Sequence, residues 1–222
     1  MAFNVQVWID ELVSKIQKNF ADRVVFIGLQ GSYRRNEATD KSDIDIILIL
    51  DELNYSDLAA YRAIVAGMPN AEKACGFVSG VEVIKNWERS ELFQFYHDTK
   101  PILNDLDFLL PLIDEEQIRR AVKIAACGIY HGCCHNVVFD KSPEILSSLY
   151  KSAFFILQAL WFLKTGQYIS SKADLAGKFE GTDLQILQSC MNRAKMVKMG
   201  MDELASEHET LMQWSSNLIR SY

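Results

Sequence analysis

The chain has 222 residues, of which 49% are apolar and 23% are charged, and its net charge is −6. These values are typical of a folded globular protein and exclude a disordered one. No apolar run approaches the roughly 20 residues that cross a bilayer, so the sequence predicts no membrane segment.

The charge is unevenly distributed along the chain. Residues 1–110 carry 11 basic and 17 acidic side chains, whereas residues 111–222 carry 12 of each. A protein that binds a nucleic-acid backbone needs a basic surface to displace counterions. Neither half has such an excess, so we expect no nucleic-acid partner and disfavour a template-dependent or tail-adding polymerase.

The cysteines and the first residues indicate the compartment. The chain has five cysteines, and its first 20 residues carry acids and lack a small-residue cleavage site. This pattern predicts neither a disulfide framework nor a signal peptide. We therefore expect a reducing cytoplasm, and the sequence leaves self-association into a homo-oligomer open.

The first half of the chain alternates between helix and strand patterns. Helical spacing of apolar residues predicts a helix over 4–19, and short β-branched runs predict buried strands at 23–29 and 43–50. The further elements in chain order are a helix over 55–67, a strand interrupted by glycines at 76–84, a short helix near 89–97 and a short strand near 101–104. Strands that are apolar on both faces predict a sheet with helices beside it.

The second half is predicted to be helical. Start and stop signals are Ser142 before Pro143, Gly166 after an apolar helix, Ser171 three residues before Asp174, and a capping box of Thr182 and Gln185 opening a helix to Gly200. The predicted fold class is α+β, with a small mixed-sheet domain at residues 1–110 and an all-α helical bundle at 111–222, joined near 108–114.

Two aspartates open the strand at 43–50. Residues two apart in a strand point to the same face, so Asp43 and Asp45 are expected to lie side by side. Two unpaired carboxylates there would repel each other and resist desolvation. A divalent cation removes both problems, because Mg²⁺ takes hard oxygen ligands and brings substrate phosphates with it. A two-metal site is one such arrangement.

A Gly-Ser pair after the preceding strand fits the same chemistry. Gly31 has no Cβ, so backbone N–H groups there can approach an anion, and Ser32 adds a hydroxyl donor. Arg34 and Arg35 supply charge that could balance a triphosphate, although a solvated loop is the simpler interpretation. Together these residues predict a triphosphate held through Mg²⁺.

The segment "GSYRRNEATDKSDIDIILIL" resembles the signature of the nucleotidyltransferase superfamily related to DNA polymerase β. The size and domain order of the whole chain resemble those of the antibiotic nucleotidyltransferases of the kanamycin and lincosamide type. The resemblance implies that Gly31 and Ser32, with Ser42 at the expected spacing, bind the nucleotide, and that Asp43 and Asp45 bind Mg²⁺. Where the family often has a second glycine this chain has Asn36, the non-glycine residue most tolerant of a left-handed backbone.

The family also places a third acid on a neighbouring strand, as a metal ligand or as a base. Glu82 is our candidate, because it lies inside the only suitable predicted strand. Glu72 and Asp98 are alternatives. If none of them reaches the metal, the domain could bind a nucleotide without efficient transfer.

Two other groups of residues have simpler interpretations. His131, Cys134 and His135 share one helical face, but zinc needs a fourth ligand, and buried cysteines with a satisfied histidine are commoner. Tyr150 and Lys151 could meet a ligand, although packed or solvated roles are equally expected.

The predicted function is Mg²⁺-dependent transfer of a nucleoside monophosphate, AMP from ATP, to a hydroxyl of a small acceptor such as an aminoglycoside or a lincosamide, with release of pyrophosphate. Two Mg²⁺ ions are expected in the substrate complex, and the helical bundle is expected to bind the acceptor. The alternative is a nucleotide-binding regulatory or toxin–antitoxin-type module. The Arg-x4–6-His pattern of the RNA-cleaving bundles is missing, because His131 is the first histidine after Arg119 and Arg120.

Overall fold

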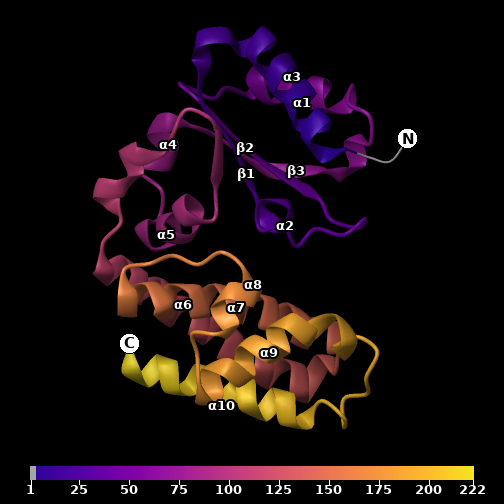
Figure 1. Ribbon diagram of the computed structural model, residues 1–222, viewed down its shortest axis with the longest axis vertical. Helices are drawn as coiled ribbons and strands as arrows, with labels where there is room; N and C mark the ends of the chain where they lie inside the picture. Colours follow the sequence, from indigo (N-terminus) through magenta and orange to yellow (C-terminus); the bar gives the residue numbers. More distant parts are fainter. Residues whose placement is uncertain (1–3) are drawn as a thin grey trace. The chain divides into compact units, whose positions relative to one another are not determined.

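The structure is a computed structural model that describes residues 4–222 (Figure 1). The chain divides into two compact units, with the boundary between Leu112 and Ile113. The first unit contains a small sheet with helices, and the second is helical, which confirms the predicted α+β class.

The first unit alternates helices and strands along the chain. Its elements are α1 (Val5–Phe20), β1 (Val24–Gln30), α2 (Gly31–Arg34), β2 (Ile44–Leu50), α3 (Tyr55–Ala66), β3 (Ala74–Gly80), α4 (Val81–Lys85), α5 (Arg89–His97) and β4 (Lys100–Leu103), with 3₁₀ turns at Ala21–Arg23, Ala71–Lys73 and Asp107–Leu112. The Asn4 side chain caps α1 by accepting from the backbone N–H groups of Gln6 and Val7.

The four strands form one mixed sheet in the order β3-β2-β1-β4. β1 is antiparallel to β2 and to β4, whereas β2 and β3 are parallel. The register pairs Asp45 with Gln30 of β1 and with Cys75 of β3. These three residues therefore lie in one row across the sheet.

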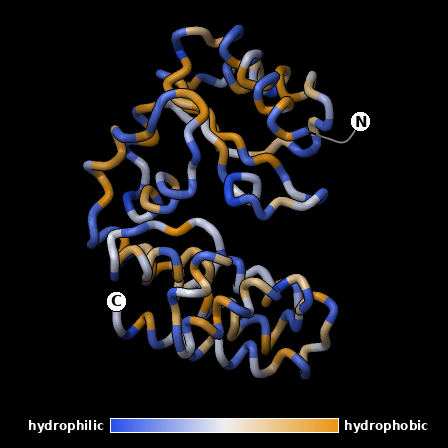
Figure 2. Tube along the Cα trace, in the orientation of Figure 1, coloured by the Kyte–Doolittle hydropathy of each residue, from blue (hydrophilic) through white to orange (hydrophobic). Residues whose placement is uncertain are grey.

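The core of this unit lies between the sheet and the helices α1 and α3, which cover one of its faces (Figure 1). Alternate residues of β2 point into this core: Ile44, Ile46, Leu48 and Leu50. Every residue of β2 is buried except Asp45, which is half-buried. The tube through the middle of the sheet is accordingly mostly hydrophobic in Figure 2. A charged side chain in such a strand needs a specific reason.

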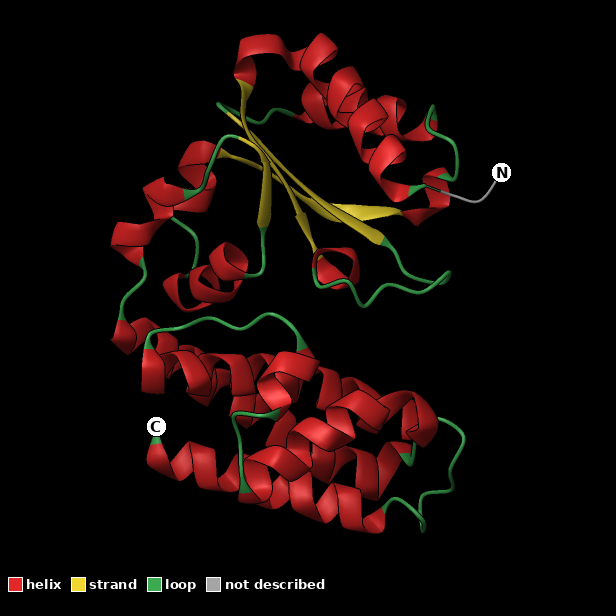
Figure 3. Cartoon of the chain, in the orientation of Figure 1, coloured by secondary structure: helices red, strands yellow, loops and turns green. Residues whose placement is uncertain are grey.

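The second unit consists of helices and loops throughout its described residues, 113–222 (Figure 3). Its elements are α6 (Glu115–His135), a π-helical turn (Asn136–Asp140), α7 (Pro143–Thr165), α8 (Lys172–Ala176), α9 (Gly181–Met196) and α10 (Ala205–Ser221). Ser142 caps α7 ahead of Pro143, Gly166 ends it with φ 71°, and Ser171 caps α8, as predicted.

One described helix, α7, is long and apolar enough to cross a membrane by length and composition. Half of its apolar window is buried inside the protein, and it includes the fully buried Leu146, Tyr150 and Leu157. The core helix of a bundle has these same properties.

Two predicted boundaries are wrong. The strand expected at 76–84 is β3 at Ala74–Gly80, and the residues after it form the helix α4. The expected capping box of Thr182 and Gln185 does not open α9, because that helix starts at Gly181 after Glu180 and ends at Met196. Gly181 has a positive φ of 59°, which glycine adopts without the cost that other residues pay.

Candidate active site

The centre of the candidate site is the start of β2. Asp45 is the second residue of the strand, and Asp43 is exposed directly before Ile44, the first. Both flanking strands bring a residue alongside Asp45, so its carboxylate lies on a rigid part of the sheet. The Cα of Gln30 pairs with it on one side and the Cα of Cys75 on the other.

Gly31 lies against the Asp45 carboxylate. A Cβ built on Gly31 would be 1.9 Å from Oδ2 of Asp45, and φ of Gly31 is +71°. Both the conformation and the lack of space require glycine here. The backbone at the start of α2 can therefore lie directly against the carboxylate.

The turn after Gly31 closes on itself through backbone hydrogen bonds. The N–H of Arg35 donates to the carbonyl of Gly31 at 3.2 Å, and that of Glu37 donates to the carbonyl of Ser32 at 2.9 Å. Asn36 has φ 56°, the left-handed conformation expected where the family often has glycine. The asparagine thus preserves the turn, as predicted.

The two serines of the motif differ in their surroundings. Ser32 is half-buried in α2, next to Gly31. Ser42 is half-buried one residue before Asp43, and its Oγ accepts from the backbone N–H of Thr39 at 2.9 Å. This bond shapes the loop that leads into β2. The Nζ of Lys73 fixes the same loop by donating to the carbonyl of Asp40 at 2.5 Å.

The two arginines are bound to the segment between α5 and β4. Nη1 of Arg35 donates to Oδ2 of Asp98 at 2.5 Å, and the two side chains are only 7% and 9% exposed. Nη2 of Arg34 donates to the carbonyl of His97 at 3.2 Å. Nε2 of Gln30 donates to Oγ1 of Thr99 at 2.6 Å and to the carbonyl of Phe95 at 3.2 Å. The α5–β4 segment thus holds the Gly31–Asn36 turn in place.

Burial controls the ionisation of this segment. It raises the pKa of Asp98 above its usual value, and the attraction of Arg35 opposes the shift without reversing it. Burial, with the positive charge of Arg34 as a lesser cause, lowers the pKa of His97 to about 4. His97 is therefore neutral near pH 7 and adds no positive charge next to Asp98.

Glu82 does not belong with the aspartates. It lies in α4, beyond the end of β3, where its carboxylate is 73% exposed and pairs with Lys85 at 2.9 Å. In the parallel register Asp45 is beside Cys75, and Gly80 is beside Leu50, so Glu82 follows the opposite end of the strand. At about 3.3 Å per residue, the row of Leu50 and Gly80 lies roughly 16 Å from Asp45. The prediction failed because the strand ends before Glu82.

Glu72 and Asp98, the two alternative candidates for the third acid, lie near the same end of the sheet as Asp45 but differ in environment. Glu72 is exposed in the turn that precedes β3. Asp98 is buried and ion-paired with Arg35, which makes it part of the support of the turn. This pairing was missed because residues 63 positions apart share no sequence pattern.

The described residues provide a partial set of metal ligands. Within residues 4–222, no group of three His, Cys, Asp or Glu side chains is arranged to hold a metal ion. The two carboxylates at the start of β2 and the backbone at Gly31 fit a Mg²⁺ ion that keeps water and phosphate oxygens as its other ligands. The fit therefore requires a nucleotide.

The histidine and cysteine cluster of α6 makes other contacts. Nδ1 of His135 is 2.7 Å from Oδ2 of Asp140, and the thiol of Cys134 lies 4.0 Å from the sulfur of Met212. His131 stacks obliquely with His135 at 5.9 Å between ring centroids. His131 and His135 are both exposed, so these contacts lie on the surface of α6, and none of the described residues completes a metal site with them.

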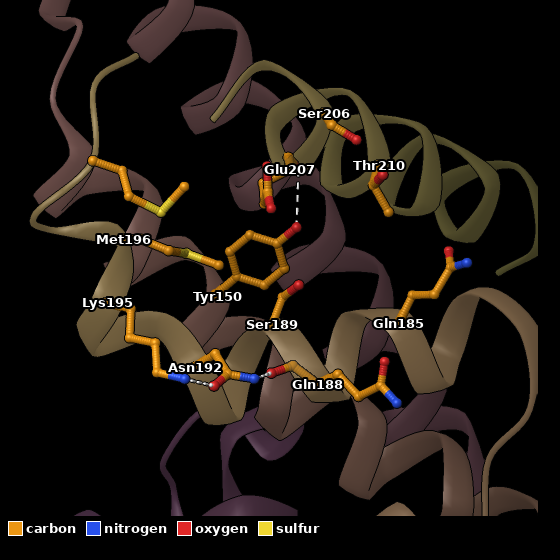
Figure 4. Close-up of a pocket in the computed structure, with 11 residues that line it drawn as sticks. Tyr150, Gln185, Gln188, Ser189, Asn192, Lys195, Met196, Ser206, Glu207 and Thr210 are labelled. Carbon is orange, nitrogen blue, oxygen red and sulfur yellow. Dashed lines mark hydrogen bonds between the residues drawn. The ribbon is translucent and has the colours of Figure 1, made fainter. Parts of the chain in front are cut away.

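The helical unit contains a polar pocket of about 460 Å³ between α9 and α10 (Figure 4). Tyr150 forms its floor: the ring is fully buried, and its hydroxyl donates to the carbonyl of Glu207 at 2.9 Å. Burial raises the pKa of this phenol. The other labelled lining residues are mainly uncharged and polar: Gln185, Gln188, Ser189, Asn192, Ser206 and Thr210, with Lys195 and Met196.

A comparison with protein families identifies the class to which this fold belongs. The model of the nucleotidyltransferase domain family matches residues 9–123, more than half of the chain. The chain therefore belongs to the nucleotidyltransferase domain family.

Two individual proteins are similar to it. A Methanocaldococcus jannaschii protein named as a protein adenylyltransferase is 41% identical over 59 residues, which is 26% of this chain and 59% of the relative. The chain thus spans about three fifths of that relative's length. The crystal structure of a spectinomycin adenyltransferase from Enterococcus faecialis, with ATP and spectinomycin, has a TM-score of 0.56 at 13% identity. That match covers 98% of this chain and 100% of the other and shows a shared fold.

Proposed function

We propose that the protein transfers AMP from Mg·ATP to a hydroxyl group of a small acceptor and releases pyrophosphate. In this reaction the acceptor oxygen attacks the α-phosphorus, the bond from that phosphorus to the bridging oxygen breaks, and pyrophosphate leaves with the electron pair. The acceptor proton passes to water. The observation that supports the proposal best is the pair Asp43 and Asp45 at the start of a buried strand, with Gly31 in contact with Asp45.

Each motif residue has a defined part in this proposal. Asp43 and Asp45 would hold Mg²⁺, which when bound neutralises the triphosphate and polarises the phosphorus. The backbone at Gly31 and the hydroxyl of Ser32 would bind phosphate oxygens, and Ser42 shapes the loop before Asp43. Groups that are held in place before the reaction stabilise charge that develops in a transition state.

The arginines divide between two tasks. Arg35 is committed to its buried pair with Asp98, so we propose that it supports the turn and does not contact phosphate. Nε of Arg34 is buried without a hydrogen-bond partner in the described part of the chain. An unsatisfied buried donor costs about 1–3 kcal/mol, a cost that a phosphate oxygen would remove. Arg34 is therefore our candidate for phosphate contact.

We also propose that the helical unit contributes acceptor contacts through the polar pocket of Figure 4. A volume of about 460 Å³ suits a small molecule. Amide side chains such as Gln188 and Asn192 both donate and accept, which matches a ligand rich in hydroxyl groups. The spectinomycin bound to the structural neighbour is a compound of that kind and is a suitable first probe.

A protein acceptor is the second candidate. It is supported by the 41% identity with the archaeal protein named as a protein adenylyltransferase, although that match spans only 59 residues. The hydroxyl group would then belong to a tyrosine, serine or threonine of a partner. This candidate also covers the toxin–antitoxin-type alternative, because transfer to a helical partner is the same chemistry.

One experiment separates these candidates. The protein is incubated with Mg²⁺ and ATP labelled at the α-phosphate, either with a panel of spectinomycin, aminoglycosides and lincosamides or with a cell extract. Label on a small molecule together with pyrophosphate supports the first candidate, and label on a protein band supports the second. Asp45→Asn is the negative control. No label above that control in either arm would contradict the transferase proposal.

A variant pair tests the acceptor pocket. Gln188→Ala removes a polar group from the pocket, whereas Gln213→Ala removes the same group from an exposed part of α10 outside it. We expect Gln188→Ala to weaken spectinomycin binding several-fold in calorimetric titration and Gln213→Ala to leave it unchanged. Equal binding by both variants would place the acceptor elsewhere.

A further inference from the structure

The helical unit has a second pocket, between the end of α6 and the start of α10. Its volume is about 630 Å³, larger than that of the polar pocket of Figure 4, and the two pockets have no lining residue in common. We call it the α6–α10 pocket. One wall contains Cys134, Val137 and Val138, and another contains Ala205, Glu209 and Met212.

Each of these walls is one face of a helical segment. The two valines lie three and four residues after Cys134, at the end of α6 and in the π-helical turn, and the second set is spaced four and three residues apart in α10. Residues at these spacings lie on the same side of a helix. The thiol of Cys134 lies 4.0 Å from the sulfur of Met212, so the two walls meet there.

A buried hydrogen-bond network connects the same two segments. Asn136 opens the π-helical turn, His208 lies in α10, and both are buried. Nδ2 of Asn136 is 3.0 Å from Nε2 of His208 and donates to the carbonyl of Ser142 at 2.9 Å, while Nδ1 of His208 is 3.1 Å from the carbonyl of Leu204. Because a satisfied buried network rigidifies its surroundings, the pocket is formed before a ligand binds, as most ligand sites are.

The pocket exposes apolar side chains that a packed bundle would cover. Val137 and Val138 are 50% and 59% exposed. They belong to the π-helical turn, a rare conformation that is found frequently at functional sites. The thiol of Cys134 and the thioether of Met212 are polarisable, and a methionine adapts to irregular shapes and makes favourable contacts with aromatic rings. These walls suit a ligand with an aromatic body.

The charged residues of the pocket favour one sign of ligand charge. Asp202, Glu209 and Lys141 line it, and all three are exposed. Two carboxylates and one ammonium group leave a net negative charge. A cationic group on the ligand is therefore attracted, and an anionic group is repelled.

We infer that the α6–α10 pocket binds a small molecule with an aromatic body and a protonated amine. The body packs against Val137, Val138 and Met212, and the amine faces Asp202 and Glu209. None of these residues belongs to the motif at the start of β2 or lines the polar pocket, so the inference goes beyond the proposed function and does not rest on it.

Two probes with the same ring system and opposite charges test the ligand class. They are 1-naphthylmethylamine and 1-naphthylacetate, titrated into the whole chain at low ionic strength, where charge is least screened. Saturation-transfer difference NMR measures both dissociation constants. We expect the amine to bind at least about fivefold more tightly than the acetate, because the two carboxylates attract the first and repel the second.

A variant pair tests the location of binding. Ala205→Trp fills the pocket, whereas Ala194→Trp places the same side chain at an exposed position of α9 outside it. Ala205→Trp should lose binding of the amine, and Ala194→Trp should bind it as the wild-type protein does. Thermal unfolding monitored by circular dichroism checks that each variant is folded, and Val138→Trp replaces Ala205→Trp if that variant is not.

A second pair tests the charge. Glu209→Gln removes a carboxylate of the pocket and keeps its size, whereas Glu116→Gln makes the same change at an exposed position in the first turn of α6, far along the helix from the pocket. We expect Glu209→Gln to weaken binding of the amine at least about threefold and not to weaken binding of the acetate. Glu116→Gln should change neither.

Several outcomes would overturn the inference. These are no binding of the amine to the wild-type protein, equal binding of amine and acetate, or wild-type binding of the amine by Ala205→Trp. Analytical ultracentrifugation tests the other possible occupant: a wild-type dimer that dissociates in Ala205→Trp would make the pocket an interface between two copies and would also overturn the inference. None of these results depends on AMP transfer, which Asp45→Asn tests separately.

Discussion

The Cβ atom that Gly31 lacks would lie 1.9 Å from Oδ2 of Asp45. The turn after β1 and the carboxylate of β2 therefore depend on each other, because neither could keep its place if residue 31 had a side chain. This contact joins the two halves of the sequence motif in space.

We expect Gly31→Ala to displace the Asp45 carboxylate. The matched control is Gly166→Ala, because Gly166 has the same φ of 71° and nothing lies within 4 Å of its Cβ position. Both variants pay a backbone cost of about 1–2 kcal/mol. Only Gly31→Ala should also lose binding of Mn²⁺ with an ATP analogue, by at least tenfold. Equal binding in the two variants would show that the contact has no role in the site.

The buried pair of Arg35 and Asp98 should dominate the stability of the turn. Removing one partner of a buried ion pair leaves an uncompensated charge and costs about 3–5 kcal/mol. We therefore expect Arg35→Ala to lower the free energy of unfolding of the first unit by that amount. Arg119→Ala breaks an exposed pair with Glu115, whose side chains are 49% and 66% exposed, and should cost no more than about 1 kcal/mol. Denaturant titration compares them, and similar losses would contradict the assignment.

Asn36 tests the left-handed position of the turn. Because its φ is 56°, Asn36→Gly should leave stability and nucleotide binding close to those of the wild-type protein. Asn36→Val places a β-branched residue in the same conformation, which costs about 1–2 kcal/mol or more. Differential scanning calorimetry compares the stability of the two variants. An Asn36→Val variant as stable as Asn36→Gly would mean that the turn adopts another conformation.

His97 should make the first unit less stable in mild acid. Its pKa falls from an ordinary 6.5 to about 4 in the folded state, so between these values the unfolded chain binds a proton that the folded chain does not. Stability is therefore complete above about pH 6.5 and declines as the pH falls toward 4. His97→Gln should flatten this part of the profile in denaturant titrations at several pH values. The same slope in both proteins would exclude His97 as its source.

The elements that define the fold could be predicted from local patterns. The strand at 43–50 is a continuous apolar run, and Asn36 and the caps at Ser142 and Ser171 are local backbone signals. Because these signals involve residues that are neighbours in the sequence, they are visible without a structure. The two aspartates are also neighbours in the sequence, but only Asp45 lies in the strand, so their common face stays a prediction.

The predictions that were wrong and the contacts that were missed depend on strand register and on residues far apart in the sequence. Glu82 was misplaced because its glycine-interrupted strand ends at Gly80, where no strong local signal marks the end. The pairing of Arg35 with Asp98 and the position of Cys75 beside Asp45 follow from how four strands align. Alignment of strands is decided by the whole sheet, so a single sequence does not reveal it.

The central claim is that Asp43 and Asp45 bind the metal of Mg·ATP and that Glu82 does not. It is tested most directly by measuring Mn²⁺ binding in the presence of an ATP analogue by electron paramagnetic resonance, for Asp43→Asn, Asp45→Asn and Glu82→Gln. The account predicts that each aspartate variant loses at least tenfold in affinity and that Glu82→Gln matches the wild-type protein. Wild-type affinity in both aspartate variants, or a loss confined to Glu82→Gln, would contradict it.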